Sequence, residues 1–149
     1  MSRLTDALIA ASGWAMGALL LALVSLDLAQ VMLRYGVGGG LPWAGDATIV
    51  GLLTLAWLGA GHLWLRGAHV AVAHLPPKAA RAAHVAVTAF LLLACGVAAP
   101  MVWEAVRLYA AIDLAALPLP MAAKYVPVLG GLIWLMAAAL LRLAQPSRW

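Results

Sequence analysis

Charged residues are scarce in this chain. Five acidic and nine basic side chains stand among 149 residues, of which 66% are hydrophobic. Soluble domains usually carry about 25% charged residues. A soluble globule of this size still exposes roughly a third of its chain's surface, so it cannot bury this much apolar surface. The composition therefore predicts that lipid solvates much of the chain.

The residues and motifs of catalysis are also missing. Cys95 is the single cysteine, which excludes a disulfide framework and predicts a buried small hydrophobe. No nucleophile elbow, phosphate loop or paired carboxylates occur, and the four histidines lack the helical i, i+4 spacing with an acid that zinc enzymes show. The basic residues are scattered singly, which argues against a nucleic-acid surface. We therefore expect no enzyme activity, no cofactor and no metal site.

Long apolar runs are what the sequence does contain. A spanning helix needs about 20 mostly apolar residues, and four runs qualify, at approximately 8–33, 47–65, 83–107 and 125–143. They are apolar on all faces, unlike the alternating strands of a β-barrel. The first run is longer than a signal-peptide core of about 7–15 residues, so we expect it to be retained. The sequence thus predicts an all-α integral membrane protein with one domain, 1–149, of four transmembrane helices.

The distribution of basic residues predicts the orientation. If the N-terminus is cytoplasmic, the inside holds six basic residues and the outside three, namely Arg3, Arg66, Lys78, Arg81, Arg142 and Arg148 against Arg34, Arg107 and Lys124. The positive-inside rule then places both termini in the cytoplasm. The connection 66–82 mixes apolar and basic residues, so we expect it on the cytoplasmic membrane surface, facing anionic lipid headgroups, with a solvated loop as the alternative.

A few polar residues interrupt the predicted helices. Asp27, Gln30 and Arg34 follow i, i+3, i+7 spacing and share one helix face. A carboxylate within a span costs about 2.5–3.5 kcal/mol at the bilayer centre. This face is either a proton or ion site, or a polar seam that pairs internally or docks on another protein. We favour the seam, because the other three helices offer no ionisable group in their middle. Trp57 and Trp134 lie mid-span and are expected to pack between helices.

Two further charged positions lie near helix ends. Asp46 opens the second helix, where an acid interacts favourably with the helix dipole. It could also pair with Arg34 across the short loop. Glu104 and Arg107 stand at i, i+3 near the end of the third helix and are expected to pair at the outer surface.

The order of short motifs resembles a known family. The motifs are Val31–Tyr35 with its Arg-Tyr pair, Leu41-Pro42-Trp43 followed by Asp46, Leu65–Val70 with its Arg-Gly-Ala-His run, and the proline-containing Leu117–Pro120 and Tyr125–Gly130. In this order and spacing, over about 8–143, they resemble the small membrane subunit of tripartite ATP-independent periplasmic (TRAP) transporters, the DctQ-like family. Two departures are that Ala44-Gly45 stand where the family often has a further acid, and that Ala71–Ala73 lack an acid.

This resemblance implies a supporting role in the bacterial inner membrane. In such systems a periplasmic substrate-binding protein delivers an organic acid, and a large multi-span membrane subunit moves it with a sodium gradient. The small subunit packs against the large one and extends its static scaffold, with no cofactor and no nucleic acid involved. On this basis we expect six residues to serve docking or membrane anchoring: Asp27, Gln30, Arg34, Trp43, Asp46 and Arg66.

Three other functions fit the composition. A free-standing, homo-oligomeric small transporter would need an essential buried acid, for which Asp27 is the only candidate. A four-helix membrane enzyme would need polar residues converging inside the bundle. The small subunit of tripartite tricarboxylate transporters has the same four-helix frame, but the motif order favours the TRAP family.

Overall fold

The computed structural model describes residues 2–67, 76–114, 116 and 118–144. It contains four long helices, α1 (Ser2–Gly36), α2 (Ala44–Arg66), α3 (Pro77–Leu108) and α4 (Val126–Leu143), and two short 3-10 helices, η1 (Tyr109–Ala111) and η2 (Met121–Lys124). Each long helix, α4 together with η2, is long and apolar enough to cross a membrane. The prediction of an all-α protein with four membrane-spanning helices is therefore confirmed.

Glycine and proline set the helix ends. After α1, Gly38 adopts a φ of +70°, a left-handed conformation that only glycine adopts without strain. Gly67 has the same φ and ends α2, where its N–H bonds the Trp64 carbonyl at 3.1 Å. Proline stands in the first turn of both α3 and α4, where a missing N–H costs nothing.

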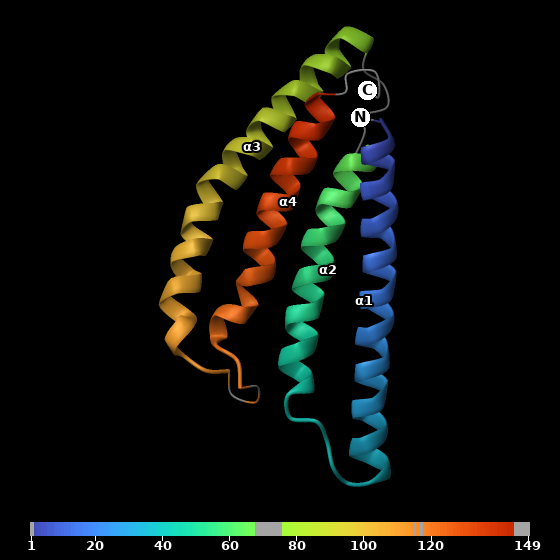
Figure 1. Ribbon diagram of the computed structural model, residues 1–149, viewed down its shortest axis with the longest axis vertical. Helices are drawn as coiled ribbons and strands as arrows, with labels where there is room; N and C mark the ends of the chain where they lie inside the picture. The colour runs from blue at the N-terminus through green and yellow to red at the C-terminus, as the bar shows by residue number, and fades with distance from the viewer. Residues whose placement is uncertain (1, 68–75, 115, 117, 145–149) are drawn as a thin grey trace.

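The four helices stand in a row, in the order α3, α4, α2, α1 (Figure 1). The two central helices are the most covered: 28% of the apolar window of α2 and of α4 is buried, against 11% for α1 and for α3. The two outer helices therefore keep broad apolar faces uncovered. Lipid or another membrane protein must solvate them, because water cannot.

The row has two distinct ends. Figure 1 places the start of α1, the end of α2, the start of α3 and the end of α4 at one end, which we call the terminal end. The α1–α2 and α3–α4 connections lie at the other, which we call the hairpin end. The fold does not decide which end is cytoplasmic, so the orientation stays a prediction. Of the predicted interfacial connection 66–82, residues 68–75 lie outside the described residues, and α3 begins at Pro77.

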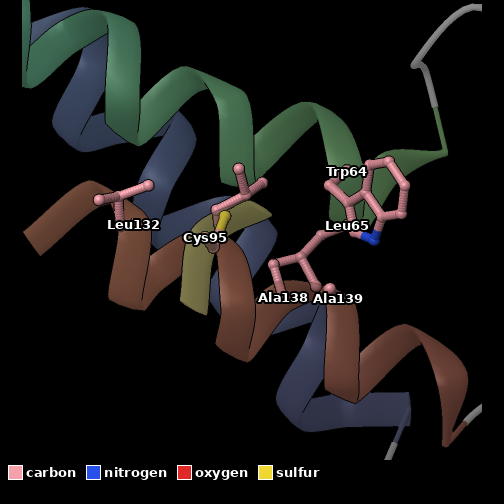
Figure 2. Packing of buried hydrophobic residues seen from close by; sticks show 7 residues of the cluster. Trp64, Leu65, Cys95, Leu132, Ala138 and Ala139 are labelled. Carbon is pink, nitrogen blue, oxygen red and sulfur yellow. The ribbon is translucent and has the colours of Figure 1, made fainter. Parts of the chain in front are cut away.

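The main hydrophobic core lies where α2, α3 and α4 meet, and it extends from the middle of α3 and α4 toward the terminal end. Its buried residues are Trp64 and Leu65 on α2, Cys95 on α3, and Leu132, Leu135, Ala138 and Ala139 on α4, most of them labelled in Figure 2. The alanines let α2 approach α4 closely, as small residues do in membrane helices. Cys95 is buried in this cluster, as predicted.

Candidate functional site

The most extensive helix contact joins α2 to α4 and contains reciprocal tryptophan–glycine packing. Trp57 on α2 lies against Gly131 on α4, and Trp134 on α4 lies against Gly61 on α2, so that a Cβ at either glycine would overlap the tryptophan. The Trp134 indole N–H also donates to the Leu58 carbonyl at 3.2 Å. The prediction that both tryptophans pack between helices is confirmed. We call this contact the tryptophan seam.

At the hairpin end an ion pair joins α2 to η2, the short helix that precedes α4. The Lys124 ammonium on η2 lies 3.0 Å from the Asp46 carboxylate in the first turn of α2, and the side chains are only 27% and 16% exposed. The alternative prediction that Asp46 pairs with Arg34 is therefore wrong. Arg34 is exposed at the end of α1, and the folded α3–α4 connection brings Lys124 to the acid instead.

That connection is compact and holds Lys124 in place. The rings of Tyr109 and Tyr125 stack with centroids 5.3 Å apart and planes 9° from parallel. The Met121 N–H donates to the Ile112 carbonyl at 2.6 Å. These contacts fix η2 between the ends of α3 and α4. The backbone of η2, which carries Lys124, is thereby positioned beside the first turn of α2.

At the terminal end the guanidinium of Arg142 links α4 to α2. Arg142, in the last turn of α4, donates to the Trp64 carbonyl near the end of α2. Gly67 stands directly against the guanidinium, so a side chain at this position would displace it. The Trp64 ring stacks on His84 of α3, with centroids 5.9 Å apart. A cation here also compensates the partial negative charge of the α2 C-terminus.

Two polar pairs join α1 to α2. The Ser12 hydroxyl lies 2.8 Å from His62 Nδ1, and both residues are buried. Towards the hairpin end, the Thr48 hydroxyl donates to the Asp27 carboxylate at 2.9 Å. Sequence reasoning missed Ser12 and Thr48, because a single small hydroxyl residue in an apolar run gives no signal of its own.

The six residues predicted for docking or anchoring do not form one cluster. Asp27 and Asp46 are engaged with Thr48 and Lys124 on neighbouring elements. The remaining four are half-buried or exposed: Gln30, Arg34, Trp43 and Arg66. Five of the six lie toward the hairpin end, and Arg66 lies at the terminal end.

Glu104 and Arg107 pair as predicted, at 3.4 Å, with both side chains well exposed. Within residues 2–67, 76–114, 116 and 118–144, no three or more His, Cys, Asp or Glu side chains gather as metal ligands would. His69 and His74 lie outside the described residues.

Apart from Glu104–Arg107, which lies within α3, the polar and aromatic contacts described above link separate elements. They join α1 to α2, α2 to η2 and α4, and α2 to α3. The chain is thus a multi-pass membrane protein whose interior polar contacts serve helix packing.

Comparison with protein families names the class more closely. The family described as tripartite ATP-independent periplasmic transporters, DctQ component, matches residues 23–148. The chain belongs to this family, and the resemblance found in its motifs is confirmed. It is the small membrane component of a TRAP transporter, located in the inner membrane, and it is not an enzyme. No curated protein matches the chain.

Proposed function

We propose that this chain is a rigid scaffold subunit. It docks on a large multi-span membrane subunit and holds it in place during sodium-coupled uptake of an organic acid, which a periplasmic binding protein delivers. Membership of the DctQ family supports a tripartite assembly with those two partners. The sodium coupling and the acidic substrate rest on the resemblance described above.

The observation that carries the scaffold role is the distribution of polar links along the row. α2 is linked to α1 by Ser12–His62 in one half and Asp27–Thr48 in the other. The same helix, α2, is linked to η2 by Asp46–Lys124, and to α4 by the Trp134–Leu58 and Arg142–Trp64 hydrogen bonds. Interhelical hydrogen bonds in membrane proteins contribute about 0.6 kcal/mol on average, so several in series oppose sliding of one helix along another.

The docking residues proposed from the sequence divide into two groups. Asp27 and Asp46 act within the chain, because each contacts a partner on another element. Arg34 and Trp43 lie exposed at the hairpin end, Arg34 near the end of α1 and Trp43 directly before α2. We therefore assign contact with the large subunit to Arg34 and Trp43 first, with Gln30 as a supporting residue.

An ion-coupling role for Asp27 is the competing function, and the geometry favours it less. The carboxylate is exposed and accepts a hydrogen bond from Thr48. A coupling site needs several ligands converging on the ion, whereas among the residues that the structure describes one hydroxyl, that of Thr48, donates to this acid. Asp27→Asn should therefore leave sodium dependence intact when the assembled transporter is placed in proteoliposomes.

The test is co-purification from the native host. The tagged full chain, extracted in mild detergent, should recover a much larger multi-span protein in equal amount. The double variant Arg34→Gln, Trp43→Ala should lower that recovery, whereas Arg107→Gln, which removes the same charge from α3 at the hairpin end, should not. Recovery of the wild-type chain only with itself would refute the scaffold proposal.

We also propose that the terminal end is cytoplasmic, on the strength of the positive-inside rule. A C-terminal fluorescent protein fusion should then be bright and a C-terminal alkaline phosphatase fusion inactive. The reverse pattern would refute this orientation without affecting the scaffold role.

A further inference from the structure

One face of α1 is uncovered and lies beside the contact with α2. α1 meets α2 through Met16 and Leu23, whose side chains lie against Gly59 and Gly51. On the adjoining face, five residues alternate in steps of four and three along the helix: Leu20, Val24, Asp27, Val31 and Arg34. This spacing keeps them on one side of the helix, and all of them are exposed. We call this surface the α1 flank.

Asp27 gives the α1 flank a carboxylate within the spanning helix. It precedes Arg34 by about 10 Å along the helix axis. The Thr48 hydroxyl donates to its Oδ1 at 2.9 Å, yet the side chain stays exposed. A carboxylate has room for further donors, and acyl chains have none to offer. A charge on a lipid-facing position of a spanning helix is costly unless a partner compensates it.

The other outer helix, α3, presents no such group. From 85 to 103, no exposed residue of α3 is charged. The hydroxyl of this stretch belongs to Thr88, which is buried and donates to the His84 carbonyl at 2.7 Å. Acyl chains can therefore cover α3 without leaving a charge unpaired, whereas they cannot do so on the α1 flank.

The α1 flank also has room for a closely packed helix. Gly17 continues the same spacing three residues before Leu20, and a Cβ at Gly17 would meet nothing within 4 Å. Small residues let the backbones of membrane helices approach closely. The surface thus combines a place for close packing, exposed apolar side chains and an acid, which together suit a spanning helix that carries a positive charge.

We propose that the large subunit docks on the α1 flank with one of its membrane-spanning helices, and that this helix brings a lysine or arginine to Asp27. This inference rests on the proposed scaffold function and names the surface and the chemistry of its partner. α1 stands at one end of the helix row (Figure 1). Asp27 therefore keeps its bond to Thr48 inside the chain and pairs outward with the partner.

The test of the surface is photo-cross-linking in native membranes. The photoreactive residue p-benzoylphenylalanine replaces one valine at a time in the full chain, at Val24 or Val31 of α1. Val97 and Val87 of α3 are matched controls, because their exposed fractions, 57% and 52%, equal those of Val24 and Val31, 56% and 51%. The α1 positions should cross-link to a much larger multi-span protein, and the α3 positions should not.

Each outcome decides between the proposals. Cross-links to the large protein from α3 alone, or equally from both helices, would overturn the α1 flank and leave the scaffold function standing. Cross-links from α1 only to a second copy of this chain would also overturn it. In a supporting result, mass spectrometry of the cross-linked peptide finds a lysine or arginine within about two helical turns of the joined residue; a partner segment without one would overturn the charge pairing.

Two substitutions separate docking from the bond inside the chain. Asp27→Lys places like charges together and should lower co-purification of the large protein at least about tenfold. Thr48→Val removes the internal hydrogen bond but keeps the carboxylate, and should keep the recovery within about threefold of wild type. Equal losses in the two variants would overturn the pairing with the partner. Failure of the wild-type chain to recover any larger protein would instead refute the scaffold function, and this docking surface with it.

Discussion

Alanine substitution at two adjacent glycines of α4 tests the tryptophan seam most directly. A Cβ at Gly131 would overlap Trp57, whereas a Cβ at Gly130 meets nothing within 4 Å. Both substitutions add one methyl group to the same helix and bring the same gain in helix propensity, about 0.5–1 kcal/mol. Their difference therefore isolates the cost of crowding at the seam.

The size of the expected loss of stability depends on which atom the added methyl group would overlap. The nearest atom to the added methyl group at Gly131 is the Cβ of Trp57, which is bonded directly to the backbone of α2. No rotamer change of Trp57 can move it, so the two helices must separate. Overpacking a well-packed core costs about 1–3 kcal/mol. We expect Gly131→Ala to be less stable than Gly130→Ala by that amount.

The assay is equilibrium unfolding of the full chain from mild detergent into increasing sodium dodecyl sulfate, followed by tryptophan fluorescence. The free energies of unfolding of the two variants are compared at the same detergent composition. A difference below about 0.5 kcal/mol, the usual range of surface substitutions, would refute close contact at the seam. A less stable Gly130→Ala would refute the helix pairing itself.

Two other contacts give predictions by the same unfolding assay. The Asp46–Lys124 pair is mostly buried, so its disruption should cost between the ~0.2–1 kcal/mol of exposed pairs and the ~3–5 kcal/mol of fully buried ones. Asp46→Lys and Lys124→Asp should each destabilise, and the double reversal should recover most of the loss; additive effects would contradict the pairing. Ser12→Ala removes the hydrogen bond to His62 and should cost about 0.6 kcal/mol. Ser25→Ala, at an exposed position of the same helix, should change stability by less than half as much.

The sequence by itself determined the number of helices and their approximate positions. Each apolar run had to become a helix, because the backbone polar groups of a lipid-spanning segment must be satisfied within the segment. Glycines of positive φ, Gly38 and Gly67, follow the ends of the first two helices. The order of short motifs was enough to identify the family, since it depends on local sequence alone.

Only the tertiary structure decided which helices are neighbours and which polar groups meet. Helices that are apolar on every side have no preferred face in a lipid environment, so hydrophobic periodicity cannot order them. The row α3–α4–α2–α1 depends on shape, above all on tryptophans that fit opposite glycines. Because packing and not sequence order places the elements, Asp46 pairs with Lys124, which is distant in sequence. Arg34, which is nearer in sequence, is exposed. Proximity in sequence favoured Arg34 as the partner of Asp46. The position of η2 brings Lys124 to the acid instead.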